Sequence, residues 1–209
     1  MRTLWLAKLL GTSLGMAAFF VGYFHLLRHP VGIPFVMPVL AIDRWIEFSP
    51  VALPLYLSLW LYVSLAPALL VNPRELLACG LAAGGLAVIG LGIFRLWPTT
   101  VAPPEVDWSA HPMFSFLKTV DASGNACPSL HVAFAVFAAV WFDRILRDSG
   151  AGTGWHWVNW AWCLGILYST IAVRQHVFLD VLAGGLLGAA VVSLGLYFLD
   201  ATRRTRATA

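Results

Sequence analysis

Four polar side chains interrupt an apolar part of the chain: Arg174, Gln175, His176 and Asp180. Apolar runs flank this stretch, so these groups lie where bilayer-spanning helices end. On a helix, His176 and Asp180 are one turn apart on the same face. A carboxylate there can hold one imidazole nitrogen and leave the other oriented for nucleophilic attack. The alternative is a satisfied His–Asp pair that only pins two helices together.

The composition is that of a membrane protein. Of 209 residues, 60% are hydrophobic and 11% are charged, and the mean hydropathy is +0.80. These values are too apolar for a water-soluble domain of this length. The net charge of +3 is small and dispersed, which argues against nucleic acid as a partner and leaves membrane lipids as the expected surroundings.

The cysteines give no sign of a disulfide framework or a zinc site. Cys79, Cys127 and Cys163 are widely separated and form no C-x-x-C pair. The segments expected on the side of the His176 stretch carry no further cluster of carboxylates, Cys or His with ligand spacing. We therefore expect no metal and no cofactor.

Six apolar stretches predict an all-α fold, a single domain over residues 1–209 built as a six-transmembrane-helix bundle. The expected spans cover residues 4–27, 51–71, 76–97, 129–146, 156–173 and 177–199. Glycines in the third span have the spacing that brings helices close together. They are Gly80, Gly84, Gly85, Gly90 and Gly92.

Residues 29–50 are apolar, but their prolines forbid one long helix. Asp43, Arg44 and Glu47 interleave with the apolar side chains. A re-entrant or surface-lying segment in the lipid headgroup zone fits this pattern, and so does a plain connecting loop. Residues 98–128 form the longest polar segment and are expected outside the membrane.

Six spans place both termini on one side of the membrane. That side holds eight of the 13 Lys and Arg side chains: Arg2, Lys8, Arg74, Arg144, Arg147, Arg203, Arg204 and Arg206. The other side holds the remaining five: Arg28, Arg44, Arg95, Lys118 and Arg174. The positive-inside rule puts the termini in the cytoplasm, so the His176 stretch faces outward from a cytoplasmic membrane.

This topology brings three groups of polar residues to the same membrane face. Arg95 ends the third span, Ser129 and His131 open the fourth, and the His176 stretch lies between the fifth and sixth. Ser129 is typical of a helix N-terminus, where exposed N–H groups and the helix dipole bind anions. With Arg174 and two histidines, the parts needed for metal-free phosphoryl transfer are present.

Two motifs resemble those of the type 2 phosphatidic acid phosphatase superfamily. Residues 128–131, Pro-Ser-Leu-His, resemble its Pro-Ser-Gly-His motif, and Ser169 with His176-x-x-x-Asp180 resembles its Ser-Arg-x5-His-x3-Asp motif. Their order, their separation of about 45 residues and the six-helix layout also fit, so the resemblance covers most of the chain. The family is metal-independent and shares its fold with vanadium haloperoxidases.

The resemblance implies a role for each matching residue. His176 is the implied nucleophile that forms a phosphohistidine, Asp180 orients it, and His131 protonates the leaving oxygen. Ser129 and the nearby backbone, at Leu130, bind the phosphate. The implied substrate is a lipid phosphate or pyrophosphate, and the implied enzyme is a hydrolase.

The sequence departs from the family pattern at three places. Leu130 replaces the usual Gly, as in the branch that contains inositol phosphorylceramide synthases, so a phosphotransferase that uses an alcohol acceptor is an alternative. Thr170 stands where Arg is expected, and Arg174 is the candidate for that charge. An ideal helix would point Arg174 away from His176, so we expect the backbone to break or turn there.

The third departure concerns the family's first motif, Lys-x6-Arg-Pro, which is not present as such. Pro103-Pro104 occupies the Arg-Pro position, and Arg95 is the nearby basic candidate for phosphate binding. A last alternative is a transporter in which the polar stretch relays protons or anions. The ionisable groups sit at span ends, which favours a surface enzyme.

Overall fold

The computed structural model describes residues 4–103, 106, 108, 111, 113, 114 and 124–207, although the side chains of 203–207 lie outside the description. The elements in chain order are α1 (Trp5–Arg28), β1 (Phe35–Met37), α2 (Ala41–Trp45), a 3-10 turn (Pro50–Ala52), α3 (Leu53–Leu57), α4 (Leu59–Leu69), α5 (Pro73–Leu96), β2 (Thr99–Val101), α7 (Leu130–Asp148), α8 (Thr153–Ala172) and α9 (Phe178–Ala207). The predicted all-α fold is confirmed. Two three-residue strands add to it.

The described helices support the prediction of a membrane protein. Four helical segments are long and apolar enough to cross a membrane: Trp5–Arg28, Pro50–Leu69, Pro73–Leu96 and Phe178–Thr202. Helices α7 and α8 occupy the expected fourth and fifth spans but are not in this group. The layout with six membrane-spanning helices therefore stays a prediction.

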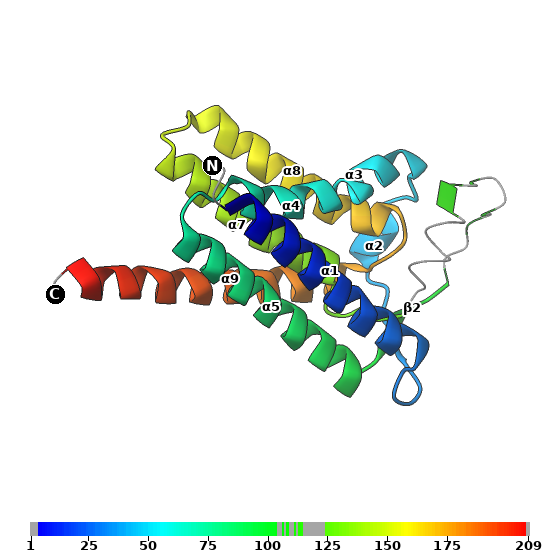
Figure 1. Ribbon diagram of the computed structural model, residues 1–209. Helices are drawn as coiled ribbons and strands as arrows, with labels where there is room; N and C mark the ends of the chain where they lie inside the picture. Colours follow the sequence, from blue (N-terminus) through cyan, green and yellow to red (C-terminus); the bar gives the residue numbers. More distant parts are fainter. Residues whose placement is uncertain are drawn as a thin grey trace.

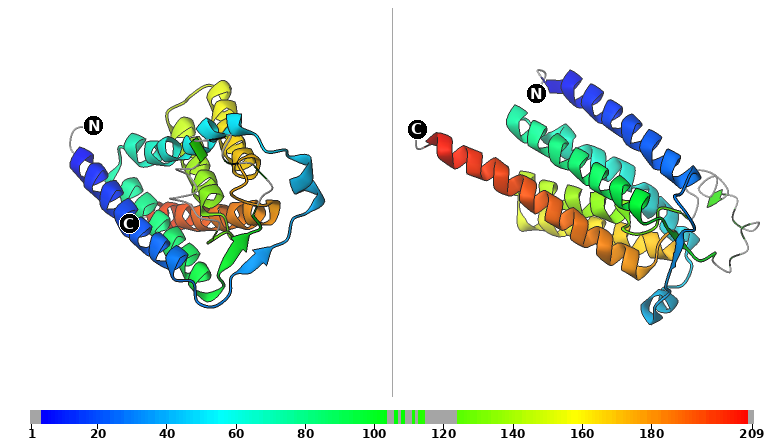
Figure 2. Two further views of the ribbon diagram at one scale, coloured as in Figure 1. Left: turned by 90° about the vertical axis from the view of Figure 1, so that its right-hand side faces the viewer. Right: turned by 90° about the horizontal axis from the view of Figure 1, so that it is seen from below.

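Helix α7 lies in the middle of the bundle and contacts α4, α5, α8 and α9 (Figures 1 and 2). Its contact with α9 is close enough to require glycine. A Cβ atom at Gly184 would lie 2.2 Å from the carbonyl oxygen of Ser129, and one at Gly188 would lie 2.3 Å from that of Ala133. Glycine spacing on α9 therefore lets the two helices that carry the motifs pack backbone to backbone.

The prediction of close packing through the glycines of the third span is wrong at four of the five positions. A Cβ atom at Gly80, Gly84, Gly85 or Gly92 would have nothing within 4 Å. At Gly90 it would meet the side chain of Leu130. Spacing alone does not say which face of a helix meets a neighbour, and α5 turns most of its glycines away.

The two ends of the bundle differ. Both termini lie at one end, and α2, β2 and the start of α9 lie at the other (Figure 2). There β1 pairs in parallel with β2, with Phe35 opposite Thr99 and Met37 opposite Val101. This pairing was not predicted. It joins residues 29–50 to the segment that follows α5.

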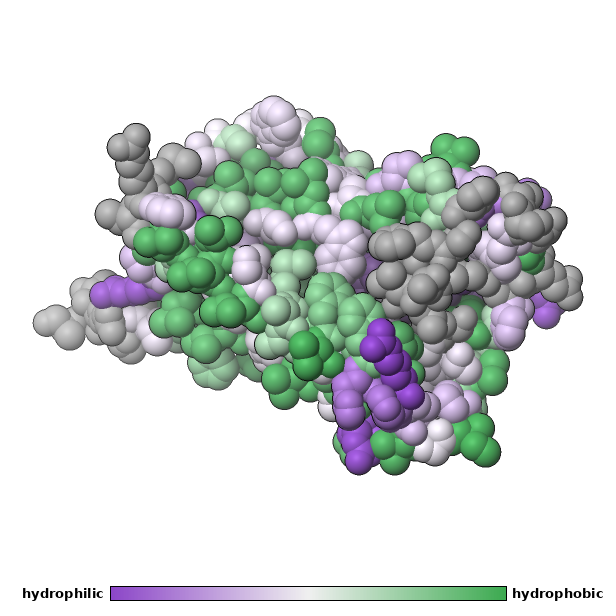
Figure 3. Space-filling model, turned by 45° about the vertical axis from the view of Figure 1, so that its right-hand side comes forward, coloured by the Kyte–Doolittle hydropathy of each residue, from purple (hydrophilic) through white to green (hydrophobic). Residues whose placement is uncertain are grey.

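The surface agrees with lipid surroundings. Hydrophobic residues cover the middle of the face in Figure 3, and hydrophilic residues gather toward its ends. At the end opposite the termini, Ile33 is 96% exposed and Trp45 is 80% exposed. These two side chains support the surface-lying interpretation of residues 29–50 in the headgroup zone.

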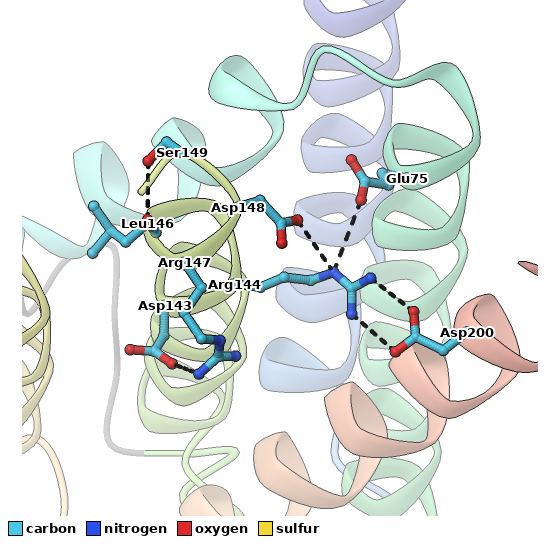
Figure 4. A network of polar contacts seen from close by, with 8 residues as sticks. All are labelled: Glu75, Asp143, Arg144, Leu146, Arg147, Asp148, Ser149 and Asp200. Atoms are coloured by element: carbon cyan, nitrogen blue, oxygen red, sulfur yellow. Dashed lines mark hydrogen bonds and ion pairs between the residues drawn. The ribbon is translucent and has the colours of Figure 1, made fainter. Parts of the chain in front are cut away.

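An ion cluster ties three helices together at the end near the termini (Figure 4). Arg144 of α7 donates two hydrogen bonds to Asp200 of α9, at 3.0 and 2.7 Å. Its Nε atom lies 3.8 Å from Glu75 of α5 and 3.9 Å from Asp148. These charges hold α5, α7 and α9 in place, far along α9 from the His176 stretch.

Candidate active site

The first turns of α7 and α9 are joined directly. Ser129 is the N-cap of α7, and its Oγ accepts a hydrogen bond from the Val132 N–H at 3.3 Å. The backbone N–H of Ser129 donates to the carbonyl of Asp180 at 3.0 Å. The prediction that Ser129 opens a helix beside the His176 stretch is confirmed. The positive end of the α7 dipole therefore lies at this end of the bundle, where it favours an anion.

The turn that carries His176 follows from the way α8 ends. The N–H of Arg174 donates to the Ile171 carbonyl at 2.9 Å, and that of Gln175 donates to the Thr170 carbonyl at 3.1 Å. This is the Schellman pattern of a helix C-terminus. Arg174 has φ +60°, a left-handed conformation that usually belongs to glycine. The expected break in the backbone at Arg174 is confirmed.

His176 lies in this turn and not on a helix, because α9 begins at Phe178. This corrects the assumption that His176 and Asp180 share one helix. They still meet: Nδ1 of His176 is 3.4 Å from Oδ2 of Asp180. Asp180 is fully buried and caps α9, since Oδ2 accepts the Val177 N–H at 3.1 Å. His176 is 8% exposed.

The His176–Asp180 contact is longer than an ordinary hydrogen bond. Nδ1 of His176 has no hydrogen-bond partner among the described residues, and the Asp180 carboxylate also meets the Cys127 thiol. Catalytic hydrogen bonds are often long without substrate and shorten when it binds.

The second histidine, His131, faces His176 from helix α7. The ring centroids of His131 and His176 are 6.0 Å apart, close enough for both rings to contact one phosphoryl group. The ring of His131 stacks on Tyr56 of α3 at 4.6 Å and lies edge-on to Trp60 of α4 at 5.9 Å. Sequence reasoning missed both aromatic residues. The available signal was their spacing, one helical turn apart at the same end of the second span.

Cys127 lies beside the Asp180 carboxylate. Burial, and secondly the charge of Asp180, raise the pKa of the Cys127 thiol to about 11. The thiol is therefore protonated at neutral pH, which argues against a nucleophilic role. Thr99 of β2 holds this segment, because its Oγ1 accepts the Cys127 N–H at 2.8 Å.

Phosphate binding at Leu130 and at Arg95 stays a prediction. The side chain of Leu130 packs in the core against Gly90, so a phosphate contact there falls to its backbone N–H. Arg95 is exposed on the last turn of α5. Pro104, which belongs to the expected Arg-Pro position, lies outside the described residues.

Arg174 lies two residues before His176 and is half-buried. Its Nη1 donates a hydrogen bond to the carbonyl oxygen of Asp43 in α2 at 3.2 Å. The guanidinium is thereby held at the turn that carries His176. Binding of phosphate by Arg174 stays a prediction.

We expect Arg174→Gly to separate stability from activity. Glycine adopts the left-handed conformation without strain, which offsets the lost hydrogen bond to Asp43, so the free energy of unfolding should change by less than about 1 kcal/mol. Loss of the guanidinium should lower kcat/KM about 100-fold, the scale of one charge-assisted hydrogen bond to phosphate. Thermal unfolding in detergent and turnover assays measure the two effects. Arg44→Gln, at an exposed position of α2, is the control, and full activity of Arg174→Gly would contradict the role.

No group of three or more His, Cys, Asp or Glu side chains in the described part of the chain could hold a metal ion. The site brings together two histidines, a buried aspartate and the N-terminus of α7. Side chains of these types can serve as a nucleophile and as a general acid in phosphoryl transfer.

Comparison with known proteins agrees with this chemistry. The family model described as PAP2 superfamily matches residues 75–204. That range holds every predicted catalytic and phosphate-binding residue, from Arg95 to Asp180. No curated protein and no solved structure matches the chain at a significant level.

Proposed function

The chain belongs to the PAP2 superfamily, and on this premise we propose that it removes phosphate from a lipid phosphate or pyrophosphate through a phosphohistidine on His176. Membership in this superfamily supports a phosphatase-type or phosphotransferase-type activity. The observation that carries the finer proposal is the meeting of two histidines from different segments. Their rings are 6.0 Å apart, and Asp180 stands behind one of them.

In the first step, Nε2 of His176 attacks the phosphorus and the bond from phosphorus to the lipid oxygen breaks. Asp180 holds Nδ1, which leaves the lone pair of Nε2 for the attack. His131 gives a proton to the leaving oxygen, so the dephosphorylated lipid departs as a neutral alcohol or, from a pyrophosphate, as a monophosphate. Tyr56 keeps the His131 ring in place by stacking on it.

In the second step, His131 takes a proton from water while the water oxygen attacks the phosphorus. The bond from phosphorus to His176 breaks and inorganic phosphate leaves, which restores both histidines. Ser129, the N–H groups at the start of α7 and Arg174 stabilise the negative charge on the phosphate oxygens in both steps.

A lipid substrate is supported by the place of the site. It lies at one end of the bundle, beside a segment that exposes Ile33 and Trp45. A lipid headgroup can reach such a site while its chains stay in the bilayer. We place the protein in the cytoplasmic membrane with the site facing outward, because Lys and Arg are more numerous on the side of the termini.

The decisive experiment is a screen of purified protein against lipid phosphates and pyrophosphates, with the phosphate labelled. Label that leaves as inorganic phosphate identifies a hydrolase. Label that moves to an added alcohol identifies the phosphotransferase alternative, which uses the same intermediate. If no phosphorylated lipid is turned over, the proposed function is wrong and the transporter hypothesis returns.

We expect the activity to survive EDTA and to be inhibited by vanadate. The proposed steps use only His131, His176 and the anion site, so removal of divalent metal should leave the rate within about twofold. Vanadate resembles the transition state of phosphoryl transfer and should compete with substrate. Steady-state assays with each reagent test this expectation. Activity that EDTA abolishes and magnesium restores would refute it.

A further inference from the structure

Asp43 lies outside the matched range of the family model, yet it contacts the segment that carries His176. It sits in α2 and is only 2% exposed, although its neighbours Arg44, Trp45 and Glu47 are exposed. A carboxylate this buried requires partners that repay its lost hydration. The hydrogen-bond partners of Asp43 show which segments it holds together.

The carboxylate of Asp43 caps two helices at once. Oδ2 accepts the Leu40 N–H at 2.8 Å, which closes the first turn of α2. Oδ1 accepts the Phe178 N–H at 2.6 Å, although Phe178 is 135 residues away in the sequence. Phe178 is the first residue of α9, and its N–H has no partner within the helix. The negative charge also suits the positive end of the α9 dipole.

The other end of the same turn is tied to Asp43 as well. The guanidinium of Arg174 donates to the Asp43 carbonyl oxygen at 3.2 Å. His176 therefore lies between two attachments to one residue, the side chain of Arg174 before it and the backbone of Phe178 after it. A third link runs nearby, since the Ser49 N–H donates to the Ala172 carbonyl at 2.9 Å.

We propose that Asp43 is a positioning residue for the phosphoryl transfer. It holds residues 174–178 in the conformation that directs His176 toward His131. It acts through the backbone and through Arg174 and does not touch the substrate. This inference rests on the proposed function, because it names a residue that the same reaction requires.

Asp43→Asn is the direct test. Both oxygens of Asp43 accept from backbone N–H groups, and an asparagine has one oxygen and one NH2 group. It therefore leaves either Leu40 or Phe178 without an acceptor. We expect kcat to fall about 10- to 100-fold while KM stays within about threefold, because a nucleophile displaced by a fraction of an ångström loses rate more than binding.

Glu47→Gln is the matched control, since it removes the same charge from an exposed position in the same segment. It should leave kcat and KM unchanged. Hydrogen–deuterium exchange, measured on the intact proteins in detergent, distinguishes a local change in the turn that carries His176 from a general loss of folding. Exchange of the amides of residues 174–180 should speed up in Asp43→Asn, while the middle of α7 stays protected.

Phe178→Pro is a second variant, which removes the N–H that Phe178 donates to Oδ1 of Asp43. Proline suits the first position of a helix and lacks the N–H that Asp43 accepts. Phe178→Leu keeps the N–H and serves as its control. We expect Phe178→Pro to reproduce the kcat loss of Asp43→Asn, and the double variant to be little worse than either single one.

The results distinguish this inference from the proposed function. If the wild type turns over a phosphorylated lipid and Asp43→Asn matches Glu47→Gln in kcat and exchange, the positioning role of Asp43 is wrong. If the wild type turns over none, the proposed function fails, and unchanged exchange in Asp43→Asn and Phe178→Pro would also remove Asp43 as the residue that holds this turn.

Discussion

His176→Ala should abolish both turnover and covalent labelling by a phosphate-labelled lipid. Without the imidazole no atom is placed to accept the phosphoryl group, so kcat should fall by about 10⁴-fold or more. In the wild type, a rapid acid-free quench should trap a phosphoramidate, which is labile to acid and stable to base. The protein should still fold, because alanine suits the turn and the backbone N–H of His176 still reaches the Thr170 carbonyl.

His29→Ala is the control for this experiment. His29 is exposed at the end of α1, on the same side of the molecule as the site. It should keep full labelling and full turnover. Retained turnover in His176→Ala would end the covalent mechanism, whatever the substrate proves to be.

Asp180→Asn should give the second largest loss, about 10²- to 10⁴-fold in kcat, with the fold intact. The oxygen nearest His176, Oδ2, also accepts the Val177 N–H that begins α9. If asparagine places its oxygen there, the cap survives but the charge that stabilises the reacting imidazole is lost. If it places the NH2 group there, the imidazole is driven to the wrong tautomer and the Val177 N–H is left unpaired.

The control for Asp180→Asn is Asp200→Asn, the same change at the other end of α9. Asp200 is 43% exposed and pairs with Arg144, so its loss should lower the thermal stability without changing kcat. Single-turnover labelling then separates the roles of the two carboxylates. Labelling of Asp180→Asn at the wild-type rate would show that Asp180 only caps α9.

Much of the chemistry was predictable because it depends on local sequence. The excess of apolar residues predicts helices in a membrane, since a chain in lipid must satisfy its backbone polar groups internally. Pro128-Ser129 predicts the start of α7, because Ser at an N-cap satisfies a free N–H. On an ideal helix Arg174 would point away from His176, which predicts a break in the backbone. The structure has this break at Arg174, where φ is +60°.

Contacts between distant segments could not be predicted in this way. Asp43 and Phe178 are 135 residues apart, and either could have been an ordinary surface residue by its local pattern. Tyr56 and Trp60 look like any aromatic pair in an apolar span until α3 and α4 place them against His131. The pairing of β1 with β2 likewise depends on where two loops meet.

The glycines also show the difference between what the local sequence predicts and what tertiary packing decides. The sequence by itself determined that the chain is helical and apolar, and it predicted that two histidines and an aspartate meet at one membrane face. Only the tertiary structure decided that α9 meets α7 through Gly184 and Gly188 while α5 turns most of its glycines outward. Spacing along a helix sets which residues share a face, but the direction of that face depends on packing against every other helix. That packing also decides which groups lie against His176.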